Sequence, residues 1–176
     1  MKKLLLTSFV FIIATASLSA QTEYGTRAGF YKSLRETNVT FFNDGLRSDT
    51  NYNEGFYIGA FVGLKLSERF YVQPEITYVS IKNDFDQLHI PVLGRYRIGK
   101  KFNVFLGPDF GFLLTDNENF KKLNFGVTFG VSYQLMKRLS IDARYNWALT
   151  EALKTDFPGT SAKFNSFQIG LTYRLD

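Results

Sequence analysis

Nine charged side chains recur at alternate positions of segments whose other positions are apolar. Six are cations and three are carboxylates: Arg27, Lys65, Arg95, Arg97, Arg144, Arg174, Glu75, Asp109 and Asp142. Charges that share one enclosed face are costly unless they pair and form hydrogen bonds. We therefore expect the three carboxylates to meet arginines, foremost Arg95, Arg97 and Arg144, in an ion-pair network that fills and stiffens an interior.

The residue types leave little room for a metal or nucleophilic centre. His89 is the only histidine and cysteine is absent, which closes the two-histidine, zinc and thiol options. A serine–histidine–carboxylate site would have to use His89, and no serine is placed beside it by spacing. We expect no cofactor and no enzyme activity, with His89 as a hydrogen-bonded network member and a lipid-active enzyme as the remote alternative.

The segment 123–135, L-N-F-G-V-T-F-G-V-S-Y-Q-L, indicates which element positions these groups. Its odd positions are large and apolar and its even positions are small or polar, as in a β-strand with two unlike faces. Such strands exceed the usual globular length of about 5–6 residues and suit the about 9–11 that cross a bilayer. The alternation predicts eight strands: residues 24–32, 55–66, 70–82, 87–99, 102–114, 123–135, 139–149 and 163–175.

The connections alternate in length. Residues 67–69, 100–101 and 137–138 are tight charged turns, whereas 33–54, 83–86, 115–122 and 150–162 are mostly longer and rich in Asn, Asp, Thr and Gly. This pattern, with an even strand number, predicts an antiparallel up-and-down transmembrane β-barrel with both termini in the periplasm. Within 33–54, Phe41-Phe42 precede the turn sequence Asn43-Asp44-Gly45, which favours an extended or hairpin protrusion over a calcium loop.

Size decides which face of such a barrel is inside. The interior of eight strands is just wide enough for side chains, and the large apolar set cannot fit there. The polar set can, because it is rich in glycine: Gly25, Gly29, Gly59, Gly63, Gly107, Gly111, Gly126, Gly130 and Gly170. We therefore predict that the apolar face contacts outer-membrane lipid, rather than the inside of a soluble carrier.

The 176 residues suffice for one domain. Met1-Lys2-Lys3, an apolar run and small residues up to Ala20 predict a signal peptide over 1–20, followed by a barrel domain over 21–176. The formal charge of +5 becomes +3 without Lys2 and Lys3, too mild and scattered for nucleic-acid binding. After residue 20, no segment has the roughly 18 apolar residues of a membrane helix.

Four short motifs resemble those of a known family: Gln73-Pro74-Glu75, Ile90-Pro91-Val92-Leu93, Leu106-Gly107-Pro108 and Asp142-Ala143-Arg144-Tyr145-Asn146. In order and spacing they resemble the PorT-like, porin-family outer-membrane β-barrels of Bacteroidota, over about residues 24–175. The resemblance implies an OmpA/OmpX-like eight-stranded barrel in a Gram-negative outer membrane. It implies little about activity, and no residue here supports the type IX secretion role of some relatives. The signal for the barrel assembly machinery usually ends on an aromatic residue, but the last outward position here is Leu175. We therefore expect the machinery to recognise Phe167 and Tyr173.

We expect a barrel with a structural or interaction role, exerted through the outward segments 33–54, 115–122 and 150–162 on a partner that the sequence does not name. The alternative is a narrow porin-like channel for small solutes or anions that uses the luminal arginines.

Overall fold

The structure is a computed structural model that describes residues 22–41, 45–81, 86–115, 121–151 and 160–175. The predicted signal peptide lies outside these residues and stays a prediction. The strands are β1 (Thr22–Phe41), β2 (Gly45–Lys65), β3 (Phe70–Ile81), β4 (Gln87–Ile98), β5 (Phe102–Leu113), β6 (Leu123–Gln134), β7 (Leu139–Ala148) and β8 (Thr160–Arg174). No helix in the described part is long and apolar enough to cross a membrane.

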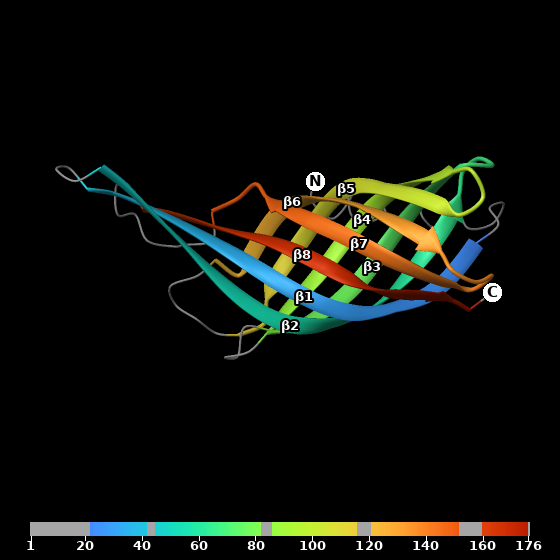
Figure 1. Ribbon diagram of the computed structural model, residues 1–176, viewed down its shortest axis with the longest axis horizontal. Helices are drawn as coiled ribbons and strands as arrows, with labels where there is room; N and C mark the ends of the chain where they lie inside the picture. Colours follow the sequence, from blue (N-terminus) through green and yellow to red (C-terminus); the bar gives the residue numbers. More distant parts are fainter. Residues whose placement is uncertain (1–21, 42–44, 82–85, 116–120, 152–159, 176) are drawn as a thin grey trace, which may run out of the picture.

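The eight strands form a closed barrel in which each lies antiparallel to its neighbours in sequence and β8 pairs with β1 (Figure 1). The predicted all-β, eight-stranded up-and-down barrel is confirmed. For β3 to β7, the predicted bounds agree with the observed bounds to within one residue. The short connections 66–69, 99–101 and 135–138 gather at one end, which we call the turn end; the opposite end is the loop end.

The hairpin protrusion favoured for residues 33–54 is confirmed, but its two strands are longer than the predicted 24–32 and 55–66. Residues 33–41 and 45–54, expected as part of a connecting loop, continue β1 and β2 in register from Ser33↔Asn53 to Phe41↔Gly45. Apolar and polar residues do not alternate in these two segments. Such alternation reflects a strand face that contacts lipid, and strands outside lipid have no such face. Backbone pairing alone still satisfies their N–H and C=O groups. The expected turn at Asn43 and Asp44 lies outside the described residues.

The two faces of the barrel wall have opposite character. Large apolar side chains are exposed on the outside; Phe30 and Phe56, for example, are 64% and 63% exposed. Arg27, Glu75 and Asp142 are instead buried inside. A soluble barrel would bury its apolar set, so this arrangement is that of a barrel whose solvent is lipid.

Aromatic pairs join neighbouring strands on the outer face. Phe30 lies opposite Phe56 in register, with ring centres 5.1 Å apart, and Phe129 lies opposite Tyr145 at 5.4 Å. Such cross-strand pairs contribute roughly 0.2–1 kcal/mol each. They help to hold the register that aims every second side chain into the lumen.

Candidate functional site

Four charged side chains from β1, β3 and β7 meet in the barrel interior. We call Arg27, Glu75, Asp142 and Arg144 the middle cluster. Arg27 Nη1 donates to Glu75 Oε2 at 3.0 Å, and its Nη2 donates to Asp142 Oδ1 at 2.8 Å. Arg144 Nη1 donates to both oxygens of Glu75, at 2.8 and 2.7 Å, and its Nε lies 3.2 Å from Asp142 Oδ1. Each arginine bridges both carboxylates, so two positive and two negative charges form a balanced ring.

The middle cluster is closed off from solvent. Its arginine side chains are 2% exposed and its carboxylates 0%. Gln73 Nε2 donates to Glu75 Oε1 at 2.7 Å, and Thr172 Oγ1 donates to Asp142 Oδ2 at 2.8 Å. Buried charges are stable only when they are paired and hydrogen-bonded. All four charges of the cluster are paired, and the Nε atoms of Arg27 and Arg144 are its buried donors without a hydrogen-bond partner among the described residues.

Aromatic rings pack against the two arginines, and a glycine leaves space for one of them. The Arg27 guanidinium lies 4.6 Å from the ring centre of Tyr57, and that of Arg144 lies 4.6 Å from the ring centre of Phe105. Gly130 lies opposite Arg144 in register, and a Cβ there would come within 2.6 Å of Arg144 Cγ. The glycine-rich alternation therefore makes room for the arginine.

A second group lies toward the loop end, around Asp109. We call Asp109, His89, Thr128 and Asn146 the loop-end cluster. Thr128 Oγ1 and Asn146 Nδ2 donate to Asp109 Oδ2 at 3.0 and 2.8 Å. His89 Nδ1 lies 3.2 and 3.3 Å from the two Asp109 oxygens, and its Nε2 lies 3.0 Å from Gln87 Oε1.

The expected arginine partner of Asp109 was therefore wrong. Its neighbour on β7 is Asn146, whereas Arg144 lies one inward position nearer the turn end and bonds to Glu75. A shift of two residues along a strand moves a side chain by about 6.6 Å, enough to change its partner.

A third group occupies the mouth of the lumen at the turn end. We call Glu23, Arg95, Arg97 and Arg174 the turn-end cluster. Arg95 Nη2 donates to Glu23 Oε2 at 2.5 Å, and Arg97 Nη2 and Arg174 Nη1 each lie 3.5 Å from Glu23 Oε1. The Tyr71 ring centre lies 4.0 Å from the Arg95 guanidinium and 5.1 Å from that of Arg97.

Sequence reasoning missed Glu23, and it assigned Arg95 and Arg97 to the wrong carboxylates. The first strand was expected to begin at Tyr24, but β1 begins at Thr22. Glu23 shares the odd-numbered phase of Arg27, so extending the alternation by one residue would have found it. Of the nine charged residues predicted to face the lumen, Lys65 belongs to none of the three clusters. It lies half-buried at the turn end of β2, opposite Tyr71.

The clusters suit structural charge pairing better than catalysis. His89 has a carboxylate at one ring nitrogen, but its other nitrogen faces the Gln87 amide oxygen instead of a hydroxyl. Within the described ranges, no three His, Cys, Asp or Glu residues gather as a metal site would need.

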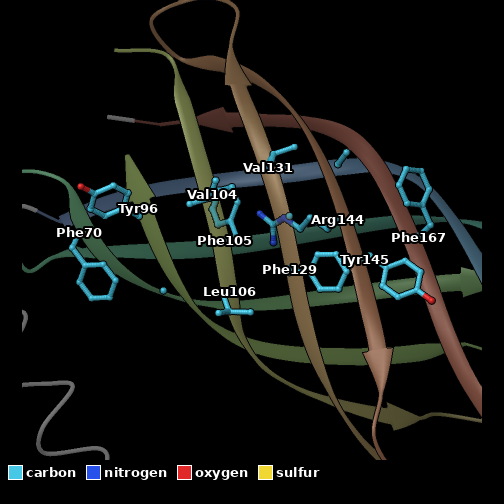
Figure 2. A pocket seen from close by; sticks show the side chains of 13 residues that line it. Phe70, Tyr96, Val104, Phe105, Leu106, Phe129, Val131, Arg144, Tyr145 and Phe167 are labelled. Atoms are coloured by element: carbon cyan, nitrogen blue, oxygen red, sulfur yellow. The ribbon is translucent and has the colours of Figure 1, made fainter. Parts of the chain in front are cut away.

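A hollow on the barrel wall is lined by residues of β3 to β8, among them the small residues Gly94, Gly130 and Ala143. Figure 2 shows Phe129 beside Tyr145 at this hollow, with Arg144 lying next to Phe105. The lining is almost entirely apolar, so the hollow suits lipid acyl chains.

The comparisons with known proteins agree with this fold. The sequence matches the family described as "Outer membrane protein beta-barrel domain" over residues 8–174, and the chain belongs to this family. The protein is therefore an outer-membrane β-barrel protein. None of the curated proteins compared with it matches the sequence.

Several solved structures are similar to this chain at low sequence identity. The Ail attachment invasion locus protein of Yersinia pestis, solved with the heparin analogue sucrose octasulfate, is 13% identical with a TM-score of 0.50, over 88% of this chain and 99% of that chain. Neisserial surface protein A is 15% identical with a TM-score of 0.46, over 86% and 95%. OprG of Pseudomonas aeruginosa is 13% identical with a TM-score of 0.43, over 89% and 97%. At these identities the likeness concerns the fold alone.

Proposed function

We propose that the protein is a multi-pass interaction barrel that acts through its loop-end segments, with both termini in the periplasm. The observation that supports this is a three-stranded sheet beyond the barrel rim (Figure 1). β1 pairs with β2 as far as Phe41↔Gly45 and with β8 as far as Val39↔Thr160. β3 begins its pairing with β2 only at Gly55↔Ile81.

The projecting part of β2 has a free edge. Among the described residues, 45–54 pair with β1 on one side and with no strand on the other. At about 3.3 Å per residue, this edge is about 30 Å long. Unpaired backbone N–H and C=O groups on an edge strand can pair with an extended segment of another chain. We infer that the sheet β2–β1–β8 is the surface that contacts a partner.

The channel alternative has less support, because the paired side chains of the middle cluster lie across the interior. Its four side chains are at most 2% exposed and are bonded to one another across the interior. A conducting path would have to separate these pairs. We expect the protein to be electrically silent in planar bilayers, and steady conductance steps from the wild type would favour the channel.

Two narrower assignments are also proposals. The PorT-like group of Bacteroidota is supported by the motif residues that enter the middle cluster: Glu75 with its donor Gln73, and Asp142 with Arg144. Absence of enzyme activity is supported by the surroundings of His89. We expect His89→Ala to leave the phospholipid and lipopolysaccharide composition of the membrane unchanged.

The decisive experiment shortens the projecting hairpin. Glu36 and Thr50 are register partners, so residues 37–49 can be replaced by the two-residue turn Asn-Gly. We expect this variant to keep heat-modifiable gel mobility, the sign of a folded barrel, and to fail to rescue the phenotype of a deletion strain.

The matched control is Glu23→Gln, which alters the lumen mouth and leaves the hairpin intact. It should rescue the deletion strain as the wild type does. Full rescue by the shortened variant would overturn the proposed function of the sheet.

A further inference from the structure

The luminal clusters differ in charge balance. In the middle cluster, two guanidiniums face two carboxylates. In the turn-end cluster, three guanidiniums share one carboxylate, that of Glu23, as far as the described residues show. The turn-end cluster therefore carries an excess of positive charge inside a partly enclosed mouth.

The three arginines are not held equally. Arg95 is 6% exposed, lies against the Tyr71 ring and bonds to Glu23 at 2.5 Å. Arg97 and Arg174 are 32% and 26% exposed, and each lies 3.5 Å from the same Glu23 oxygen. Arg174 Nη2 also donates to the Lys137 carbonyl, which ties it to the turn between β6 and β7. Arg97 and Arg174 thus keep several N–H donors for a further acceptor.

A polar hollow lies among these side chains. Its volume is about 30 Å³, and its lining includes Arg97, Arg174, Ser140 and Thr172. A space of this size holds about two water molecules. Arg95 also lines the hollow, and its buried Nε has no hydrogen-bond acceptor in the described part of the chain. The hollow therefore combines unused donors, hydroxyl groups and excess positive charge.

Two of the three exposed turns around the mouth add positive charge, whereas the charges of Glu68 and Arg69 on the third cancel. Four exposed cations lie on two of the tight connections: Lys100, Lys101, Lys137 and Arg138. Clustered charge of one sign raises the local concentration of the opposite ion. Because salt screens exposed charges, these turns aid the approach of an anion, and its retention depends on the hollow.

We propose that the turn-end cluster is an oxyanion site of phosphate class, with Arg97 and Arg174 as its ligands. Guanidiniums bind phosphate oxygens through paired, charge-assisted N–H donors, which suits two partly exposed arginines that line the same hollow. The anion would place one or two of its oxygens in the hollow in exchange for water, with the rest of the group in the open mouth. It would thereby reduce the excess positive charge that Glu23 alone does not neutralise. Its source is either free phosphate or the headgroup of a phospholipid in the adjoining leaflet. The site is independent of the proposed function of the projecting sheet.

The test is equilibrium dialysis of the full-length protein against radiolabelled inorganic phosphate, in octyl glucoside micelles that contain no phosphate. We expect saturable binding of one phosphate per chain. The double variant Arg97→Gln/Arg174→Gln should weaken it by about tenfold or more, equivalent to about 1.4 kcal/mol.

The matched control is Lys100→Gln/Lys101→Gln, which removes the same charge from an exposed turn at the same end. It should change the affinity by less than about twofold, in keeping with screened surface charge. Heat-modifiable mobility shows that each variant is folded. Binding that does not saturate, or equal weakening by both double variants, would overturn the site.

A competition arm separates the two sources. Short-chain phosphatidylglycerol is added to the micelles at constant phosphate, with short-chain diacylglycerol as the headgroup-free control. Displacement of phosphate by the phospholipid alone supports a lipid headgroup as the natural occupant. Retention of phosphate supports the free anion.

Discussion

The middle cluster and the turn-end cluster contain the same residue types but differ in charge balance and in exposure to solvent. Both place arginines against carboxylates on the inner faces of strands that are distant in sequence. In the middle cluster the charges balance, contacts reach 2.7 Å and solvent is excluded. In the turn-end cluster one carboxylate serves three arginines, two contacts are 3.5 Å long, and half-exposed guanidiniums line a hollow.

The difference shows that position along the barrel decides what an arginine–carboxylate pair can do. Halfway along, water does not reach the charges, so a closely paired set with balanced charge is favoured. At the mouth, water and ions reach the same groups and tolerate an excess of one sign. The middle cluster is therefore suited to closing the lumen, and the turn-end cluster to exchanging a ligand.

The largest predicted effect is at Glu75. Glu75→Gln leaves two buried guanidiniums with one carboxylate, and loss of one partner of a buried ion pair costs about 3–5 kcal/mol. We expect the free energy of unfolding in lipid vesicles to fall by that amount, measured in urea with Trp147 fluorescence as the probe. Trp147 is the only tryptophan and lies on the lipid-facing wall.

A double-mutant cycle sharpens this prediction. Arg144→Gln together with Glu75→Gln should cost less than the sum of the two single losses, because the double variant removes both partners of one contact. Additive losses would show that the middle cluster is not a coupled unit.

The second prediction compares two glycines. Gly130→Ala places a Cβ 2.6 Å from Arg144 Cγ, and overpacking of this kind costs about 1–3 kcal/mol. At Gly63 a Cβ would meet its nearest neighbours, Arg95 Nη2 and Glu23 Cβ, at 3.5 Å, which is ordinary contact. Gly63→Ala should therefore leave the urea midpoint nearly unchanged. Equal losses at both positions would mean that the middle is no more crowded than the mouth.

The smallest predicted effect is at Glu23. Glu23→Gln removes a carboxylate that is 13% exposed at the mouth of the lumen. Its loss should lie below the about 3–5 kcal/mol of a fully buried ion pair, because water and salt reach part of the cluster. We expect a small loss of unfolding free energy that shrinks further as sodium chloride is raised. The Glu75→Gln loss should change little with salt, because solvent ions do not reach the middle cluster. A large, salt-independent loss at Glu23 would contradict the contrast between the clusters.

Much of the barrel could be predicted because the outer face of its wall contacts lipid and the inner face lines a polar lumen. The alternation in Leu123–Gln134 and its counterparts predicted the strand number and most strand bounds. Six of the nine charged residues that it placed on the inner face are buried: Arg27, Glu75, Arg95, Asp109, Asp142 and Arg144. The alternation could not give their partners. Arg27 and Asp142 are 115 residues apart and meet only through barrel closure. Asp109 bonds to His89 because of its height along β5, which depends on the stagger of the strands.

The projecting hairpin marks the limit of the same signal. Outside lipid, residues 33–41 and 45–54 have no apolar face to record in the sequence, and their strand structure comes from pairing with each other and with β8.

The sequence by itself therefore determined the solvent of each face, because side-chain polarity at alternate positions is a local property. Only the tertiary structure decided which charges neutralise one another, which mouth keeps an excess and how far the first hairpin reaches. Those outcomes depend on closure and register, which bring residues from distant strands to the same height in the lumen.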